Sequence, residues 1–250
     1  MSGYDYAPRG RIGIGTPQAN PTVEDELRIL LPPAVGMSVT RLTSLAAKPE
    51  DRLRDYLCRL ETFLDSFDTL KLDAFGFACT ASSYLVDIKV ADVIVDRCMI
   101  RRGYPIVTAA DAIVRALDRL SAKKMAIISP YPAALAEAAT TYWRRRGFEV
   151  TAVAAAGDLL PGADTRGIYA LGSEDARRAL LGLDLAGAEV VLFSGTGMPS
   201  LPLLASQTSG VPMLSSNLCL AAALCDLLGQ GDPLTDSAPW AARCRAAVTH

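Results

Sequence analysis

The chain has 250 residues, half of them hydrophobic, which suffices for the core of one large domain or two small ones. Its net charge of −2 offers no basic field, so we expect no nucleic-acid partner. No apolar run is long enough to span a membrane, and residues 1–11 lack the apolar centre of a signal peptide. We therefore expect a cytoplasmic protein without a membrane partner.

Short apolar segments alternate with helical patterns along the chain. In residues 49–64 leucines recur at helical spacing, the Ala-rich residues 133–146 are also helical in pattern, and Ser173 with two following acids predicts a capped helix start. The predicted strands are residues 11–16, 74–78, 104–108, 124–129, 148–155, 189–194 and 211–215. This alternation predicts parallel α/β layers.

Three pairs of segments repeat in the same order, which indicates an internal duplication. The pairs are residues 11–18 with 124–131, 77–80 with 193–196, and 103–120 with 210–228. We predict an α/β fold of two pseudo-symmetric lobes, each a parallel four-stranded sheet flanked by helices. The lobes would be residues 10–120 and 121–228, with a tail, 229–250, that packs back on the first lobe. Because ligands bind beyond the carboxyl ends of parallel strands, the active site should lie between the lobes.

Histidine and cysteine usage narrows the chemistry. The single histidine is His250, the last residue, which excludes Ser-His-Asp and Cys-His catalysis and the usual His-bearing zinc sites. The six cysteines form no CxxC pair, and Cys58, Cys219 and Cys225 lie in helical patterns. Reduced thiols are the better interpretation.

Cys79 is the first candidate for a functional side chain. It ends the apolar run 74–78 and precedes a tract of small residues, 80–83, at an expected helix start. Backbone N–H groups there would lower the pKa of a thiol and could close around an anion. Gly195 occupies the equivalent tip in the second repeat. A buried structural cysteine is the alternative.

Other motifs carry weaker signals. Gly13 and Gly15 form a GxG, but Gln18 stands where a dinucleotide fingerprint needs its third glycine. Asn20 and Tyr131 lie on loops at duplicated strand tips, where each could equally be an ordinary loop residue. Ser215, Ser216 and Asn217 are most simply the N-cap of the following helix.

Five stretches in order resemble the aspartate/glutamate racemase superfamily, in its maleate cis-trans isomerase and arylmalonate decarboxylase branch. The resemblance runs from Arg11 to about Gly229. The stretches are "RIGIGTPQANPTVEDEL", "FACTASS", "AIISPY", "FSGTGMPSL" and "GVPMLSSN". It implies a pseudo-symmetric two-lobed fold, an active site between the lobes, a small carboxylate substrate, and neither cofactor nor metal.

The resemblance also implies roles for individual residues. Members of this branch place a cysteine at the strand tip of each lobe; the first matches Cys79, and the second falls at Gly195. An asparagine of the isomerases falls at Ala176. The carboxylate-binding donors would correspond to Asn20, Thr80, Ala81 through its N–H, Tyr131, Gly195 and Thr196.

A lone thiol limits the reaction. Two-base racemisation needs two acid/base groups, and Gly195 supplies none. Cys79 could add as a thiolate to the double bond of a cis-enedioate, so that a maleate isomerase-like reaction follows. It could instead be the proton donor of an arylmalonate-type decarboxylase. A non-catalytic carboxylate binder is a third alternative, and the Ala-rich helix faces would suit a homodimer.

Overall fold

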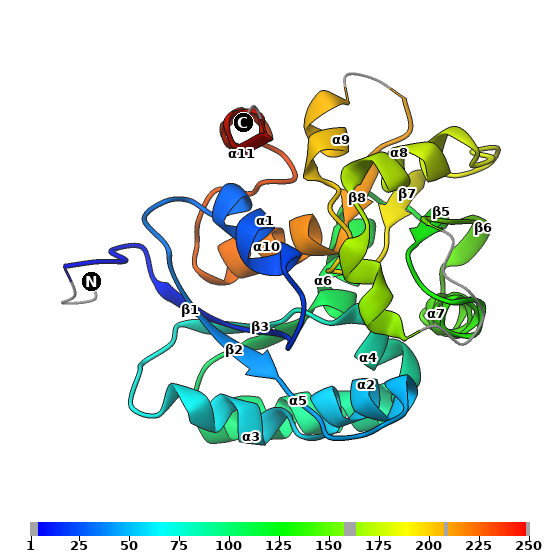
Figure 1. Cartoon of the computed structure of the whole chain (residues 1–250). Coiled ribbons are helices and arrows are strands. Elements are labelled where there is room, and N and C mark those ends of the chain that lie inside the picture. The colour runs from blue at the N-terminus through cyan, green and yellow to red at the C-terminus, as the bar shows by residue number, and fades with distance from the viewer. Residues whose placement is uncertain (1–4, 158–163, 208–209, 249–250) are drawn as a thin grey trace.

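The computed structural model describes residues 5–157, 164–207 and 210–248, so His250 and the end of the predicted tail lie outside the described residues. Two parallel sheets of four strands each form the centre of the molecule (Figure 1). The first has the order β2-β1-β3-β4 and the second β6-β5-β7-β8. The strands are β1 (Arg11–Pro17), β2 (Gly36–Leu42), β3 (Ala74–Phe77), β4 (Ile106–Thr108), β5 (Lys124–Ser129), β6 (Glu149–Ala155), β7 (Val190–Phe193) and β8 (Met213–Ser215). The matching orders confirm the predicted fold class.

Among the strands that the structure describes, β2 is the one that the sequence patterns did not predict. It pairs with β1 along its whole length, from Gly36 opposite Arg11 to Leu42 opposite Pro17. As an edge strand it is only half-buried, and its polar residues interrupt the apolar pattern. A strand with this composition carries little periodic signal.

Helices cover both faces of the sheets. In Figure 1, α2, α3 and α5 lie together on one side of the first sheet, and α1 and α10 lie on the other. The helices are α1 (Thr22–Leu30), α2 (Pro49–Cys58), α3 (Leu60–Leu64), η1 (Asp65–Phe67), α4 (Thr80–Leu85), α5 (Ile88–Arg102), α6 (Ala109–Arg119), α7 (Ala133–Arg145), η2 (Thr165–Ala170), α8 (Ser173–Leu181), α9 (Leu201–Ser206), α10 (Ser216–Leu227) and α11 (Ala238–Val248). None of the helices in the described ranges is both long and apolar enough to cross a bilayer.

Two helix predictions need adjustment. The continuous pattern of 49–64 is two helices, α2 and α3, which meet at Arg59. Helix α8 does begin at Ser173, but Gly172 is the N-cap residue, and its N–H donates to Asp175 Oδ2 at 2.8 Å. A carboxylate three residues into the helix satisfies that N–H, as in half of a capping box.

Helices α6 and α10, which follow equivalent strands of the two repeats, pack extensively on each other. Helix α10 also packs on β3 of the first sheet. A side chain at Gly76 would lie 3.1 Å from Leu224, so this glycine sets the close helix–sheet contact.

The predicted division at residues 120 and 228 stays a prediction. Helix α11 packs against α9 and α1.

The GxG of β1 has a packing role. A Cβ at Gly13 would lie 2.6 Å from Leu72 Cδ1, and one at Gly15 would lie 2.8 Å from the Phe75 ring. Both glycines are within a strand rather than in a phosphate-binding turn. They leave the room that Phe75 needs in the core.

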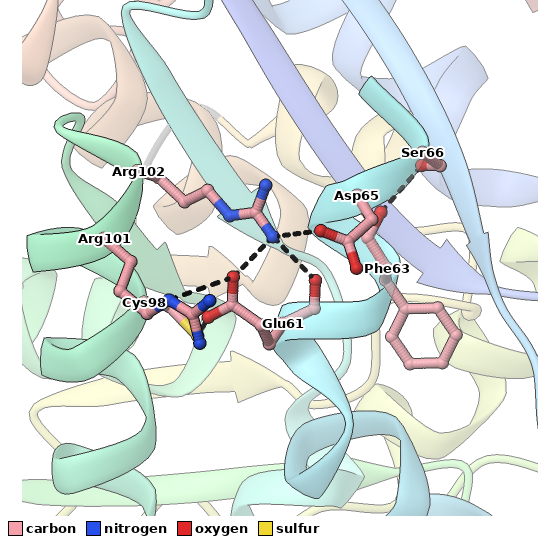
Figure 2. A network of polar contacts seen from close by, with 7 residues as sticks. All are labelled: Glu61, Phe63, Asp65, Ser66, Cys98, Arg101 and Arg102. Atoms are coloured by element: carbon pink, nitrogen blue, oxygen red, sulfur yellow. Dashed lines mark hydrogen bonds and ion pairs between the residues drawn. The ribbon is translucent and has the colours of Figure 1, made fainter. Parts of the chain in front are cut away.

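A polar network secures α5 to α3 and η1 (Figure 2). Arg102 lies between Glu61 and Asp65 and pairs with both carboxylates. The Cys98 thiol donates to Glu61 Oε2 at 3.4 Å, and burial together with this carboxylate raises the pKa of Cys98 to about 11. Cys98 is therefore held as a thiol in a structural network.

Candidate active site

Cys79 lies at the carboxyl end of β3 and is the N-cap residue of α4, as the sequence predicted. The hydroxyl of Ser82, one helical turn later, donates to Cys79 Sγ at 3.2 Å. The backbone N–H groups of Ala81 and Ser82 also point toward the sulfur and favour its charged form. The residue is only 3% exposed.

Burial decides the protonation state of Cys79. Removal from water raises the pKa of the thiol above its ordinary value, and the Ser82 hydroxyl and the two N–H groups offset only part of that rise. In the ligand-free protein Cys79 is therefore a neutral thiol at neutral pH. The sequence left open whether a bound dianion, which would raise the pKa of Cys79, or the N–H donors, which would lower it, has the larger effect.

Thr196 joins the end of the second sheet to the strand that carries Cys79. Its hydroxyl donates to the Ala78 carbonyl at 2.8 Å and accepts from Asn20 Nδ2 at 3.3 Å. Asn20 is oriented by its Oδ1, which accepts from the N–H of Thr22 at 2.9 Å. All of these polar groups are buried. The amide of Asn20 and the hydroxyl of Thr196 thus lie beside the Cys79 turn.

Two tyrosines make further contacts between the sheets. The hydroxyls of Thr80 and Tyr131 lie 2.8 Å apart, and those of Tyr84 and Ser194 lie 3.0 Å apart. Burial raises the pKa of Tyr84 to about 12 and that of Tyr131 well above its ordinary value. Both phenols therefore stay protonated and are available as hydrogen-bond donors.

Gly195 leaves no room for a second thiol. Its φ of +97° lies in the left-handed region, and a Cβ there would stand 2.8 Å from Pro130 Cγ and 3.1 Å from the Tyr131 hydroxyl. The Gly195 N–H donates to Ser216 Oγ at 3.0 Å. The Tyr131 hydroxyl occupies the volume that a side chain at this strand tip would fill.

The structure brings together the seven residues that the sequence singled out. Cys79, Thr80 and Ala81 form the turn at the end of β3. The other four lie around this turn on different loops: Asn20, Tyr131, Gly195 and Thr196. Their chemical roles stay predictions. Ala176, where the isomerases carry an asparagine, is fully buried in α8.

Several contributing residues were not predicted. Ser215 does cap α10, since its Oγ accepts from the Leu218 N–H at 3.1 Å. Its neighbours do more than the expected capping: Ser216 receives the Gly195 N–H, and Asn217 Nδ2 donates to the Thr196 carbonyl at 3.0 Å. Ser82 and Tyr84 could have been flagged because they lie three and five residues after Cys79 on the same short helix, α4.

Glu26 is a buried carboxylate next to Asn217. Its Oε1 accepts from the N–H groups of Ser200 and Leu201, at 2.8 and 3.2 Å, and its Oε2 accepts from Asn217 Nδ2 at 2.7 Å. Burial raises the pKa of Glu26, and these donors oppose the rise. The carboxylate thus caps the start of α9 from α1 and braces Asn217, which holds the Thr196 backbone.

Replacing Glu26 by alanine should destabilise the protein by about 3 kcal/mol, because two N–H groups and one amide would lose their buried acceptor. Chemical denaturation at neutral pH measures the loss. Asp25→Ala is the matched control, since Asp25 is the exposed neighbour on the same helix and should cost less than about 0.5 kcal/mol. Equal losses for the two variants would contradict the bracing role.

Metal-ligating side chains do not cluster near the thiol. Within the ranges that the structure describes, no group of three or more His, Cys, Asp or Glu side chains is arranged to hold a metal ion. The polar atoms near Cys79 include the hydroxyls of Thr80, Ser82 and Thr196, the carboxamide of Asn20 and backbone N–H groups. These are donors suited to a carboxylate.

The sequence profile of the arylmalonate decarboxylase family matches residues 73–234, which is more than half of the chain and includes Cys79, Tyr131 and Thr196. The chain belongs to the arylmalonate decarboxylase family. This membership agrees with the branch that the sequence motifs resemble.

The individual relatives include both maleate isomerases and arylmalonate decarboxylases. A maleate isomerase of Pseudomonas putida is 26% identical over 231 residues, which cover 86% of this chain and 90% of the relative. A maleate cis-trans isomerase of Nocardia farcinica, solved as a cysteine-to-serine mutant with a covalently bound succinylcysteine intermediate, superposes with a TM-score of 0.75 at 24% identity, covering 88% and 93% of the two chains. A liganded double mutant of arylmalonate decarboxylase, with one glycine changed to cysteine and one cysteine to serine, gives 0.74 at 16% identity over 91% and 99%. These structures share the fold.

Proposed function

We propose that this protein is a cofactor-independent enzyme that isomerises a small cis-enedioate of the maleate type, with Cys79 as its nucleophile. The observation that carries the proposal is the thiol itself, held at the carboxyl end of β3 among donors from both sheets. The similarity to a maleate isomerase supports the substrate class.

The reaction would proceed through a covalent adduct on Cys79. The thiolate forms an S–C bond to one alkene carbon, and the π electrons move toward the carboxylate on the other carbon as an enediolate. The former double bond is then single and rotates. The electron pair of the enediolate then moves back to form the trans double bond, and the S–C bond breaks to release the thiolate. A succinylcysteine intermediate in the Nocardia farcinica enzyme is an adduct of this type.

The surrounding donors would bind the carboxylates and the developing negative charge. Thr80 and the Ala81 N–H lie on the nucleophile's own turn, and Asn20, Tyr131 and Thr196 approach it from other loops. Gly195 would contribute through its backbone. To bind substrate these donors would change partners, since the Thr196 hydroxyl now donates to the Ala78 carbonyl and the Gly195 N–H to Ser216 Oγ. Turned toward the substrate, they would stabilise an enediolate.

Decarboxylation of a malonate-type acid is the second candidate, and the protonation state of Cys79 favours it. A neutral thiol can donate a proton to the enediolate that remains after CO₂ has left. Burial raises the pKa of Cys79, which keeps that proton in place. The family profile that matches the chain is that of the decarboxylases.

The pH dependence of turnover separates the two reactions. Addition needs the thiolate, so kcat/KM for maleate should rise about tenfold per pH unit until the pH passes the raised pKa of Cys79. Proton donation needs the thiol, so kcat/KM for a phenylmalonate should stay flat through neutral pH and fall above the same pKa. Initial rates with both substrates between pH 6 and about 10 measure this. A flat maleate profile would contradict thiolate addition.

A cytoplasmic location and a homodimer stay predictions from the sequence. A non-catalytic carboxylate binder is the outcome if neither maleate nor phenylmalonate is turned over while carboxylates still bind. Sedimentation velocity of the full chain tests the homodimer.

A further inference from the structure

Arg52 is a buried cation on α2, the helix next to the Cys79 turn. It lies one turn before Tyr56 on the buried face of α2, and α2 packs against α4, the helix that Cys79 caps. Arg52 is 5% exposed, and among the described residues it is the only buried arginine or lysine. A buried guanidinium is costly unless an anion pairs with it.

Its present anion is Asp164, at the start of η2. Arg52 Nη2 donates to Asp164 Oδ1 at 2.6 Å, and the Thr165 hydroxyl lies 3.5 Å from the same nitrogen. In the part of the chain that the structure describes, both of these contacts use one nitrogen of the guanidinium and no second carboxylate approaches it. A guanidinium can offer five donors to planar anions.

Asp164, in contrast, has a second cation. Arg166 donates to Asp164 Oδ2 from Nε at 3.1 Å and from Nη2 at 2.7 Å. This side-chain bond is the main reason that the pKa of Asp164 is lowered to about 2. The Asp164 carboxylate would therefore still be paired with Arg166 if Arg52 bound another anion. Breaking the Arg52–Asp164 ion pair should therefore raise the free energy of the Asp164 carboxylate only slightly.

Two tyrosines lie within electrostatic range of both Arg52 and the thiol. Tyr56 and Tyr169 both lie close enough to Cys79 and to Arg52 that each group affects the pKa of each phenol. The Tyr169 ring lies on the turn after β7, since a Cβ at Gly197 would be 2.6 Å from its Cε1. The guanidinium and the thiol thus lie near the same two phenols, on the packed helices α2 and α4.

We propose that Arg52 binds the distal carboxylate of the substrate and exchanges the Asp164 carboxylate for it when the site fills. This inference rests on the proposed function, because it takes one substrate carboxylate to lie at the Cys79 turn. A planar guanidinium recognises a carboxylate with two parallel hydrogen bonds. Arg52 would thus select small dicarboxylates over monocarboxylates of equal length.

Calorimetric titration of the full-length protein with succinate and with butyrate tests the proposal, since neither compound has a double bond. Arg52→Gln should weaken succinate binding about 10- to 100-fold, the effect of one lost hydrogen-bonded charge, and should change butyrate binding little. Asp164→Asn should leave succinate binding equal or stronger, because it removes the competing anion. Arg52→Lys, which keeps the charge, replaces Arg52→Gln if the latter does not fold, and should weaken succinate binding by a smaller factor.

The contrary outcomes are equally specific. If Asp164→Asn weakens succinate binding as much as the Arg52 variant does, the pair is only a structural link and the proposal is wrong. Equal losses for succinate and butyrate, or no succinate binding by the wild type, also overturn it. Arg52-dependent succinate binding without turnover of maleate or phenylmalonate would contradict the proposed function and leave the role of Arg52 intact.

Discussion

Cys79→Ser should lower turnover of maleate and of phenylmalonate by at least about 10³-fold while the fold is retained. A serine hydroxyl is a far weaker acid and nucleophile than a thiol, so it fails in both candidate reactions. The thiol is buried and receives a hydrogen bond from Ser82, which a serine hydroxyl can also accept. The loss should therefore appear in kcat, with little change in the binding of succinate.

Cys58→Ser is the matched control, because Cys58 is the exposed free thiol and lies at the end of α2. It should retain full activity. Steady-state rates and succinate affinity for both variants complete the experiment. If Cys79→Ser turns over either substrate at the wild-type rate, Cys79 has no catalytic role.

Restoring a second thiol by Gly195→Cys should damage the protein rather than improve it. A side chain at φ +97° costs about 1–3 kcal/mol in strain, and overlap with Pro130 and Tyr131 adds about 1–3 kcal/mol. Displacement of Tyr131 would also break its contact with Thr80, 2.8 Å away. Because misplacing such a group by about 1 Å can cost 10²-fold, we expect a loss of at least this size in kcat/KM.

Gly147→Ala isolates the backbone part of this effect. Gly147 has a similar φ of +87°, but a Cβ there would meet no atom within 4 Å. Denaturation and activity measurements should show that Gly147→Ala is destabilised by the strain alone and keeps its activity, whereas Gly195→Ala is worse in both. Similar stabilities and activities for the two alanine variants would mean that Tyr131 does not fill the Gly195 site.

The sequence predicted the Cys79 turn and its symmetry mate because their signals are local. An apolar run that ends on Cys79 before small hydroxylated residues shows a strand end and a helix start within a few positions. The repeat of that pattern at 193–196 predicted the second tip. By contrast, β2 was missed because a half-buried edge strand has mixed composition.

The remaining parts of the site depend on contacts that no local pattern records. Arg52 and Asp164 are 112 residues apart in the chain, and Tyr84 and Ser194 are 110 apart. The protonation state of Cys79 depends on its burial, which arises only in the folded chain. Glu26 looked like one acid among three on an amphipathic helix, yet it is the one that is buried.

Mapping of a covalent adduct tests the central claim most directly. The full-length protein is incubated with isotopically labelled maleate, quenched in acid during turnover so that the enediolate is protonated to a stable thioether, and digested for mass spectrometry. We predict a labelled succinyl group on the peptide that contains Cys79, and none on the peptide of Cys58. Formation of fumarate without any label on Cys79 would contradict the account.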